Sequence, residues 1–361
     1  MSAVKHFRFE GEFRMRRGRL RNPVFAYETW GILNPAKDNA VLIFTGLSPS
    51  AHVASSEENS ASGWWEDMVG PDKPIDTSRY FVICVNSLGS CFGSTGPASP
   101  DPGTGQPYRL TFPVLCLEDV ANGGALVLDH LGIDRLHAVV GASMGGMTAL
   151  AFALLHPSRS QGLLSISSAA RSLPFSIAVR SLQREMIRSD PAWCDGNYPL
   201  DRSPVTGMRL ARKLGMITYR SADEWTERFG RERASGDGAS GPPPFGIDFE
   251  VESYLDAHAN RFVGTFDANC YLYLSRAMDL FDVTDHGGSL TAALRRTELA
   301  RALIIGVETD FLFPVEQQEE LAIGLKQVVA DVSFRRLSSI QGHDSFLVNM
   351  DRFRPAVAEF F

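Results

Sequence analysis

Cysteine is scarce in this sequence, which limits the thiol chemistry available to it. The chain of 361 residues has five cysteines, and none belongs to a Cys-x-x-Cys pair. This spacing argues against a zinc site, because structural zinc sites draw on closely spaced cysteine pairs. The number is odd and three lie in or beside apolar runs, so we expect free, buried thiols in a reducing compartment. The cysteines are Cys84, Cys91, Cys116, Cys194 and Cys270.

Long apolar runs and an excess of positive charge are also missing. No stretch of about 18 apolar residues is present, and no apolar run follows the basic segment 1–20 as in a secretory signal. Lysine and arginine total 35 against 42 acidic residues, a formal net charge of -7. Nucleic-acid binding needs a basic surface. We therefore expect a cytoplasmic protein with neither nucleic-acid nor membrane partners, in which an anionic substrate is met by a local basic cluster.

The composition that is present, 44% hydrophobic and 21% charged, is that of a globular protein. Short apolar runs bounded by turn residues predict strands, and segments of helical period lie between many of them. This alternation is typical of a mostly parallel sheet flanked by helices, and the first strands can form an antiparallel start. The predicted strands are 25–30, 40–45, 80–85, 136–140, 162–166, 302–305 and 332–336, and the predicted helices between them include 117–131, 144–155 and 315–328.

The middle of the chain has no strand pattern. From 173 to 286 helical periodicity takes over, and a polar stretch rich in glycine and proline, 232–244, predicts a loop within it. Strand–helix alternation then resumes. We expect one α/β domain, formed by 1–172 and 287–361, that carries a helical insertion at 173–286. The helical segments of the insertion are 175–187, 207–214, 251–261 and 270–280.

A Gly-x-Ser-x-Gly motif stands at the end of one predicted strand. Residues 141–147 read GASMGGM, after strand 136–140 and before an alanine- and leucine-rich helix. In the nucleophile elbow of the α/β-hydrolase fold, the serine occupies a strained turn whose flanking positions must lack side chains. This context favours Ser143 as a nucleophile above a helix N-terminus. The alternative is a glycine-rich turn in which the serine only caps the helix.

A serine hydroxyl needs a base, and the base needs an acid that orients it. In this fold the chain order is serine, acid, histidine. Asp310 follows the strand at 302–305, with Glu308 as the rival acid, and His343 follows the strand at 332–336. These positions predict the triad Ser143, Asp310 and His343. The alternative for His343 is a histidine on the surface of a loop.

Two backbone N–H groups are expected to stabilise the oxyanion. Met144 follows the nucleophile at the helix N-terminus, and Leu47 lies on the loop after an early strand. Gly46 lets the backbone of that loop approach the substrate. A glycine turn without a catalytic role is the alternative. Such a triad forms an acyl-enzyme and leaves open what attacks it: water makes an esterase, and another nucleophile makes a transferase.

Seven ordered blocks that extend over nearly the whole chain resemble one family of acyltransferases. In these blocks the sequence resembles the homoserine O-acetyltransferase family, which includes serine O-succinyltransferases. The blocks are 27–31 (YETWG), 50–53 (SAHV), 63–65 (GWW), 70–77 (GPDKPIDT), 85–97 (VNSLGSCFGSTGP), 141–147 (GASMGGM) and 342–347 (GHDSFL).

Three segments depart from the commonest homoserine acetyltransferase pattern and look like the serine O-succinyltransferase branch: 45–49, 86–91 and 173–185. The resemblance implies that acceptor choice is set by Gly46, Leu47, Ser48 and Pro49, and acyl-CoA choice near Arg180. A succinyl group ends in a carboxylate, which is costly to enclose without a cation. Arg180 on a predicted helix can supply that cation, or it can be a solvated arginine on the helix face.

The cluster of Arg171, Arg180, Arg184 and Arg188 can also attract the phosphates of CoA to an acidic protein. For the amino-acid acceptor, the resemblance implies that Arg212 binds the α-carboxylate and Asp344 the ammonium. The alternatives are a surface ion pair for Arg212 and a loop cap for Asp344.

The reaction that the resemblance implies is succinyl transfer from succinyl-CoA to L-serine by a ping-pong acyl-enzyme mechanism, for cysteine biosynthesis. It needs no metal and no bound cofactor, with succinyl-CoA as co-substrate. The resemblance also implies a homodimer. Homoserine O-acetyltransferase and homoserine O-succinyltransferase of methionine biosynthesis remain alternatives within the class, and a carboxylesterase-type hydrolase remains outside it.

Overall fold

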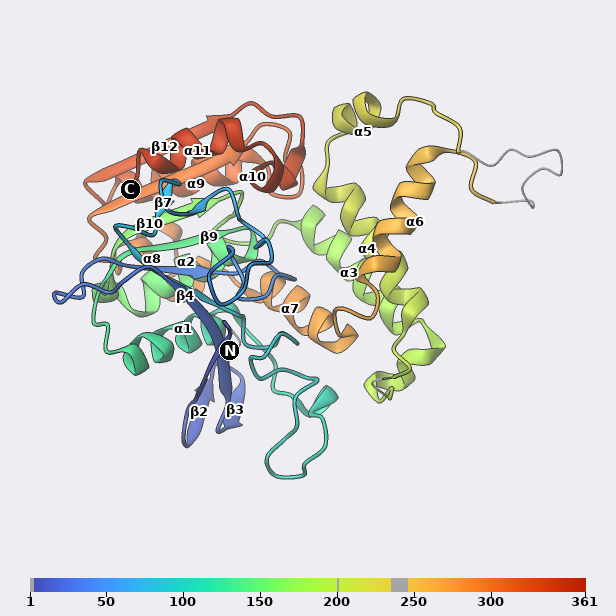
Figure 1. The fold of residues 1–361 in the computed structure, drawn as a ribbon, viewed down its shortest axis with the longest axis horizontal. Coiled ribbons are helices and arrows are strands. Elements are labelled where there is room, and N and C mark those ends of the chain that lie inside the picture. The colour runs from blue at the N-terminus through green and yellow to red at the C-terminus, as the bar shows by residue number, and fades with distance from the viewer. Residues whose placement is uncertain (1–2, 200, 235–245) are drawn as a thin grey trace.

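In the computed structural model of the chain, strands and helices alternate on both sides of a helical middle segment (Figure 1). The structure describes residues 3–199, 201–234 and 246–361. The strands are β1 (Lys5–Arg8), β2 (Glu12–Met15), β3 (Gly18–Arg21), β4 (Val24–Trp30), β5 (Ala40–Phe44), β6 (Val69–Gly70), β7 (Ile75–Asp76), β8 (Phe81–Val85), β9 (Leu136–Ala142), β10 (Ser160–Ile166), β11 (Arg301–Val307) and β12 (Asp331–Leu337). The helices are α1 (Leu117–Leu131), α2 (Met144–Leu155), α3 (Pro174–Arg188), α4 (Val205–Tyr219), α5 (Ala222–Phe229), α6 (Glu250–Phe262), α7 (Ala268–Leu280), α8 (Leu290–Leu294), α9 (Val315–Lys326), α10 (Ser345–Val348) and α11 (Met350–Ala358).

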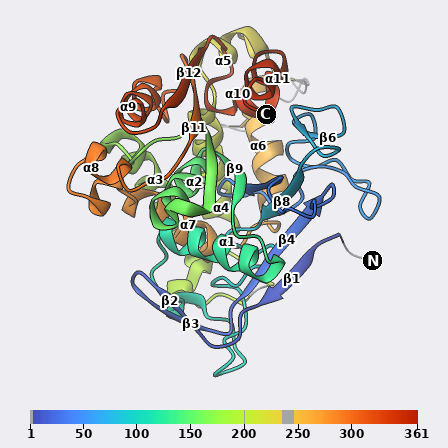
Figure 2. The same ribbon diagram turned by 90° about the vertical axis from the view of Figure 1, so that its left-hand side faces the viewer.

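One sheet of 8 strands runs through the molecule in the order β1-β4-β8-β5-β9-β10-β11-β12. Figure 2 shows this sheet extending from β1 and β4 on one side to β12 on the other. The pairs β1–β4 and β4–β8 are antiparallel, and the pairs from β8 to β12 are parallel. This arrangement confirms the predicted α/β-hydrolase fold, with a mostly parallel sheet and an antiparallel start.

The register of the parallel strands brings four loops to one edge of the sheet. Phe44 at the end of β5 pairs with Gly141 near the end of β9. On the other side, Ile166 at the end of β10 pairs with Ile305 near the end of β11, and Val307 at the end of β11 pairs with Leu337 at the end of β12. The loops after β5, β9, β11 and β12 therefore leave the sheet at its carboxyl edge, where ligands bind in open parallel sheets.

Alternate side chains of the central strands pack into two hydrophobic cores, one on each face of the sheet. Leu42 and Phe44 of β5 belong to one core together with side chains of α1, α2 and α9. Val41 and Ile43 belong to the other, which packs against α11 and the segment that contains Trp65. The strands are buried on both faces, which is why they read as continuous apolar runs.

The predicted insertion, 173–286, falls between β10 and β11, where the described residues form helices and add no strand to the sheet. In Figure 1, α3, α4, α5 and α6 stand beside the sheet domain, while α7 returns to it. Side chains of α7 such as Cys270 and Leu274 enter the same core as α1 and α2. Helix α7 thus anchors the helical segment on the sheet domain. The loop predicted at 232–244 falls largely on residues 235–245, which lie outside the described residues.

Membrane-spanning helices and metal-binding clusters are both absent from the described ranges. None of the helices placed there is long and apolar enough to cross a bilayer. In those same ranges, no group of three or more His, Cys, Asp or Glu side chains is placed to hold a metal ion. All five cysteines are free thiols: Cys84, Cys116 and Cys270 are buried, Cys91 is half-buried and Cys194 is exposed.

Candidate active site

Ser143 occupies the sharp turn between β9 and α2. Its backbone has φ 54° and ψ -125°, a conformation that a residue with a side chain rarely adopts. A Cβ atom on Gly141 would lie 2.0 Å from the Gly145 carbonyl oxygen, and one on Gly145 would lie 2.2 Å from that of Phe44. Only glycine fits at either position. The Ser143 side chain makes no capping hydrogen bond to α2, so the role of a helix-capping serine does not apply.

His343 connects this serine to an acidic side chain. Its Nε2 lies 2.8 Å from the Ser143 Oγ, and its Nδ1 lies 2.7 Å from Asp310 Oδ2. The imidazole is only 4% exposed, and the ring of Phe313 stacks on it at 5.2 Å between centroids. His343 is therefore not a histidine on a loop surface. The structure brings the three predicted triad residues into one hydrogen-bonded chain.

The second oxygen of Asp310 is fixed by the backbone. Asp310 Oδ1 accepts hydrogen bonds from the N–H groups of Leu312 and Phe313, at 3.0 and 2.8 Å. The rival acid Glu308 instead points to the surface, where its side chain is 47% exposed and lies 3.4 Å from Arg336. This geometry favours Asp310 as the orienting acid.

Burial and charge act on His343 in opposite directions. Burial disfavours the imidazolium, but the charge of Asp310 and its hydrogen bond outweigh this, so the pKa of His343 is raised above its ordinary value. Hydrogen bonds also connect the loop that carries Asp310 to the loop that carries His343. The Thr309 hydroxyl donates to the Ser339 carbonyl at 2.6 Å and accepts from the Gly342 N–H at 3.1 Å.

The two predicted oxyanion donors lie on either side of the nucleophile turn. Met144 is the first residue of α2, where N–H groups have no acceptor within the helix. Leu47 lies on the loop after β5, which approaches α2 so closely that Gly145 has no room for a side chain. Gly46, Ser48 and Pro49 line the same cavity as Ser143. The Met144 side chain is buried, so any contribution to the cavity comes from its backbone.

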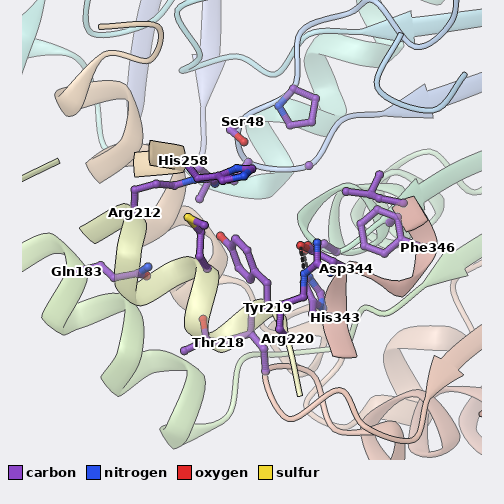
Figure 3. A pocket seen from close by; sticks show the side chains of 18 of the residues that line it. Ser48, Gln183, Arg212, Thr218, Tyr219, Arg220, His258, His343, Asp344 and Phe346 are labelled. Atoms are coloured by element: carbon purple, nitrogen blue, oxygen red, sulfur yellow. Dashed lines mark hydrogen bonds and ion pairs between the residues drawn. The ribbon is translucent and has the colours of Figure 1, made fainter. Parts of the chain in front are cut away.

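The cavity above Ser143 lies between the sheet domain and the helical segment. It measures about 1290 Å³, counting the part open to solvent. Figure 3 shows Arg212 and His258 from the helical segment on one side, His343, Asp344 and Phe346 on the other, and Tyr219 between them. Side chains of the sheet domain and of the helical segment thus line one cavity beside the nucleophile, and this cavity is open to solvent.

Arg212 is a half-buried cation for which the described residues supply no counter-ion. Within the described ranges its guanidinium forms no ion pair, and its Nε is buried without a hydrogen-bond partner. It packs on the ring of Phe262, with 4.5 Å from Cζ to the ring centroid. The alternative of a surface ion pair is thus wrong. A half-buried guanidinium that lines a cavity and has an unpaired Nε is suited to bind a carboxylate.

Asp344 faces the same cavity and is held by a neighbouring arginine. Its Oδ2 lies 3.1 Å from Arg220 Nε, and Arg220 in turn donates to Glu224. Burial raises the pKa of Asp344 above its ordinary value, and the charge of Arg220 is the largest effect opposing that rise. The side chain makes no capping bond to α10, which excludes the role of a loop cap. An aspartate placed here can accept an ammonium group.

Arg180 also lines the cavity and is 4% exposed, so it is not a solvated arginine on the helix face. The rest of the basic cluster is largely engaged elsewhere. Arg171 pairs with Glu320 at 2.8 Å, Arg184 pairs with Asp279 at 2.7 Å, and Arg188 lies over the ring of Trp193.

Sequence reasoning missed several side chains of the cavity wall, among them Tyr219, Arg220 and His258. One signal for this region was present in the sequence. Residues 221–224 read SADE, the pattern of a helix start, and the Ser221 hydroxyl accepts from the Glu224 N–H in the structure. That pattern would have located α5 and the turn that carries Arg220.

Comparisons with known proteins agree with this geometry. A family model described as alpha/beta hydrolase fold matches residues 39–349. A serine O-succinyltransferase from Litchfieldella anticariensis is 56% identical over 99% of this chain and 98% of its own length, and other curated relatives of that name are 53 to 58% identical. A solved homoserine O-acetyltransferase from Bacillus anthracis superposes with a TM-score of 0.90, 29% identity and coverage of 100% and 98% of the two chains. A solved esterase, E22, has a TM-score of 0.88, 28% identity and 99% coverage of both chains.

Proposed function

The chain belongs to the α/β-hydrolase fold family, and within it to the serine O-succinyltransferase branch of the homoserine O-acetyltransferase family, and from this we propose that it transfers succinyl from succinyl-CoA to the hydroxyl of L-serine. One observation carries the proposal. Ser143 and His343, with Asp310 bound behind the imidazole, share one cavity with three arginines, of which Arg180 and Arg212 have buried nitrogen atoms without partners. Two such cations suit two carboxylates, one on the acyl group and one on the acceptor.

In the first half-reaction His343 takes the proton of the Ser143 hydroxyl as it attacks the thioester carbonyl. Asp310 orients the imidazole and stabilises its protonated form. The N–H groups of Leu47 and Met144 are the donors to the oxyanion, and each such donor typically contributes about 10²- to 10³-fold in kcat. The tetrahedral intermediate collapses, His343 returns the proton to the leaving thiolate, and Ser143 carries a succinyl ester.

In the second half-reaction L-serine enters the same cavity. Arg212 binds its α-carboxylate and Asp344 its ammonium group, which aims the hydroxyl at the ester carbonyl. His343 takes the proton of that hydroxyl and then returns it to the Ser143 oxygen. O-succinyl-L-serine leaves, a compound whose activated ester suits replacement by sulfide in cysteine biosynthesis.

Acceptor and donor choice follow from the two ends of the cavity. Ser48 and Pro49 on the loop after β5 narrow the acceptor end beside Ser143, which favours serine over the longer homoserine. Arg180 meets the terminal carboxylate of the succinyl group. No metal and no bound cofactor takes part in these steps.

We extend the proposal to the whole molecule. Residues 173–286 form a lid that excludes water from the acyl-enzyme, on a catalytic domain of 1–172 and 287–361. Two chains pair through these lids as a homodimer, and the use of succinyl-CoA, together with the free thiols, suits a cytoplasmic enzyme.

The test offers the purified protein four pairs of substrates: succinyl-CoA or acetyl-CoA with L-serine or L-homoserine. The highest kcat/KM is expected for succinyl-CoA with L-serine. A highest value for acetyl-CoA with L-homoserine would assign the enzyme to the homoserine O-acetyltransferases instead, and succinyl-CoA with L-homoserine to the homoserine O-succinyltransferases.

A hydrolase is the second candidate, favoured by the likeness to esterase E22. Water then replaces the amino acid in the second half-reaction. A hydrolase releases succinate from succinyl-CoA at a steady rate without any acceptor, whereas the proposed transferase releases CoA in a burst that stops until L-serine is added.

A further inference from the structure

The Arg180 guanidinium is hydrogen-bonded along its Nε–Nη2 edge, while its Nη1 has no partner in the described residues. Its Nε donates to Asp279 Oδ1 and its Nη2 donates to Ser172 Oγ, each at 2.6 Å. In the described part of the chain, Nη1 is buried without a partner. A guanidinium carries five N–H donors in one plane, so these two contacts fix the plane and leave the Nη1 end to be satisfied. A buried donor without an acceptor costs free energy, which an incoming carboxylate recovers.

Asp279 on α7 is shared between two arginines. Its Oδ1 binds Arg180, and its Oδ2 lies 2.7 Å from Arg184 Nη1. Both arginines belong to α3, one turn apart, and all three side chains are largely buried. One carboxylate between two guanidinium groups leaves one positive charge unbalanced in this cluster. An acyl group that ends in a carboxylate balances it, and an acetyl group does not.

Ser172 can only accept, and not donate, in its hydrogen bond with Arg180 Nη2. Its hydroxyl donates its only proton to the Met278 carbonyl at 2.9 Å. The oxygen of Ser172 is therefore left as an acceptor toward Arg180 Nη2. Both anchors of Arg180 thus depend on the end of α7, where Met278 and Asp279 are adjacent.

We propose that Asp279 is the positioning residue for the choice of acyl donor: it holds the Nε edge of Arg180 and restrains Arg184, so that the Nη1 end of Arg180 stays free for the terminal carboxylate of the succinyl group. Asp279 does not line the cavity and acts only through Arg180. This inference rests on the proposed function, because it assumes a succinyl donor.

Asp279 has two effects that can be told apart: it orients the Arg180 guanidinium, and it balances one positive charge. Without the carboxylate, two like charges one turn apart on α3 repel each other, and Arg180 leaves the plane that its neighbours define. A misplacement of about 1 Å in a binding group costs about 10²-fold in rate. The acetyl group has no carboxylate to place, so its transfer does not depend on the plane of Arg180.

The experiment measures acylation of the enzyme in single turnovers with succinyl-CoA and with acetyl-CoA, and takes the ratio of the two second-order rates. In Asp279→Asn the ratio is expected to fall at least about tenfold. In Ser172→Ala, which removes one hydroxyl beside the cavity and preserves the charges, it is expected to fall about threefold. The acetyl-CoA rate of each variant reports whether the nucleophile and base are intact.

A charge-matched variant separates the two explanations. Asp279→Asn combined with Arg184→Gln restores the number of unbalanced charges but not the contact to Arg180. Under the positioning role the ratio stays low in this double variant, and recovery to the wild-type ratio would overturn it. Asp279→Glu keeps the carboxylate and is expected to recover part of the ratio.

The outcomes for the inference and for the proposed function differ. If the wild-type enzyme prefers succinyl-CoA and both Asp279→Asn and Ser172→Ala keep its full preference, Asp279 has no positioning role and the function stands. If the wild-type enzyme itself prefers acetyl-CoA, the proposed function fails and the inference fails with it. Should Asp279→Asn not fold, Asp279→Glu, which displaces the carboxylate by one methylene, takes its place, and an undiminished ratio in that variant would overturn the inference.

Discussion

Asp344 Oδ2 lies 3.1 Å from Arg220 Nε, at the junction between the loop that carries His343 and the turn that begins α5. This contact joins the sheet domain to the helical segment across 124 residues of sequence. Arg220 has a second partner in Glu224, so it is fixed on both sides. The proposed ammonium site therefore depends on an arginine that is itself held by the helical segment.

The first prediction concerns Arg220. In Arg220→Met, Asp344 loses the charge that most opposes its raised pKa, so its pKa rises further and its carboxylate is no longer held. The KM for L-serine is expected to rise about tenfold, while acylation by succinyl-CoA changes little. Because Asp344 must be ionised to bind an ammonium group, the loss grows as pH falls. Steady-state kinetics at several pH values measure both effects.

Arg209→Met is a matched control, because Arg209 lies on the same helical segment and pairs with Asp256 at 3.7 Å. It should leave the KM for L-serine near the wild-type value. An unchanged KM in Arg220→Met would contradict the role given to the Arg220–Asp344 pair.

The second prediction concerns pH. His343 must be neutral to accept a proton, and its pKa is raised, so kcat/KM is expected to be lost as pH falls through a value above 6.5. In Asp310→Asn the charge of Asp310, the largest cause that raises the pKa of His343, is lost while burial remains, so the acid limb of the profile moves to lower pH. The rate itself falls about 10⁴-fold, as expected when a triad loses its orienting carboxylate.

The control for this pH experiment is Glu308→Gln. Glu308 follows the same strand as Asp310 but lies at the surface beside Arg336. Its profile should match that of the wild-type enzyme. A shift in Glu308→Gln with none in Asp310→Asn would reverse the assignment of the acid.

The third prediction separates stability from activity at Arg212. Arg212 is half-buried and its buried Nε has no hydrogen-bond partner, which costs free energy in the folded state, so Arg212→Met should keep or raise the Tm. The same change removes the proposed partner of the acceptor carboxylate. Discharge of the acyl-enzyme by L-serine is expected to slow about 10²-fold, since a charge-assisted hydrogen bond is lost from a buried site.

Thermal unfolding and stopped-flow discharge of the acylated enzyme measure these two effects. Lys213→Gln changes the neighbouring cation, which pairs with Asp256, and should alter neither. A large drop in Tm in Arg212→Met with normal discharge would show a structural role instead.

The fourth prediction tests the nucleophile turn. In Gly145→Ala the new Cβ would lie 2.2 Å from the Phe44 carbonyl oxygen and 3.1 Å from that of Thr45, and backbone cannot move aside. Unfolding free energy is expected to fall by about 3 kcal/mol or more, together with loss of activity. Gly103→Ala, where the nearest atom is a side-chain oxygen of Asp101 at 3.3 Å, should remain close to wild type. Equal stability of the two variants in urea unfolding would contradict the close approach of the two loops.

Prediction of the fold from sequence succeeded where burial is high. The strand predicted at 162–166 is observed as β10 (Ser160–Ile166), and the helices predicted at 117–131 and 144–155 match α1 and α2. These elements are apolar runs or strongly periodic segments. By contrast β1 and β2 were missed, because both carry charged, exposed residues at the rim of the molecule.

Site residues were likewise predicted where the local sequence has a clear pattern and missed where it has none. Ser143, Asp310 and His343 could be placed because chain order and strand ends locate them. Asp279 could not, since its role depends on a contact with Arg180 that spans 99 residues. No pattern in the sequence around Asp279 or around Arg180 predicts that contact. Tyr219 and Arg220 were missed for the same reason, because α4 and α5 meet the sheet domain only in the folded chain.

The most direct test of the central claim is the intact mass of the protein after reaction with succinyl-CoA in the absence of an acceptor. The mass is expected to increase by one succinyl group per chain, on the peptide that contains Ser143, and to return to its original value when L-serine is added. Ser143→Ala should show no increase. Product formation without any covalent adduct, or an adduct on another residue that L-serine discharges, would contradict the role of Ser143 as the nucleophile.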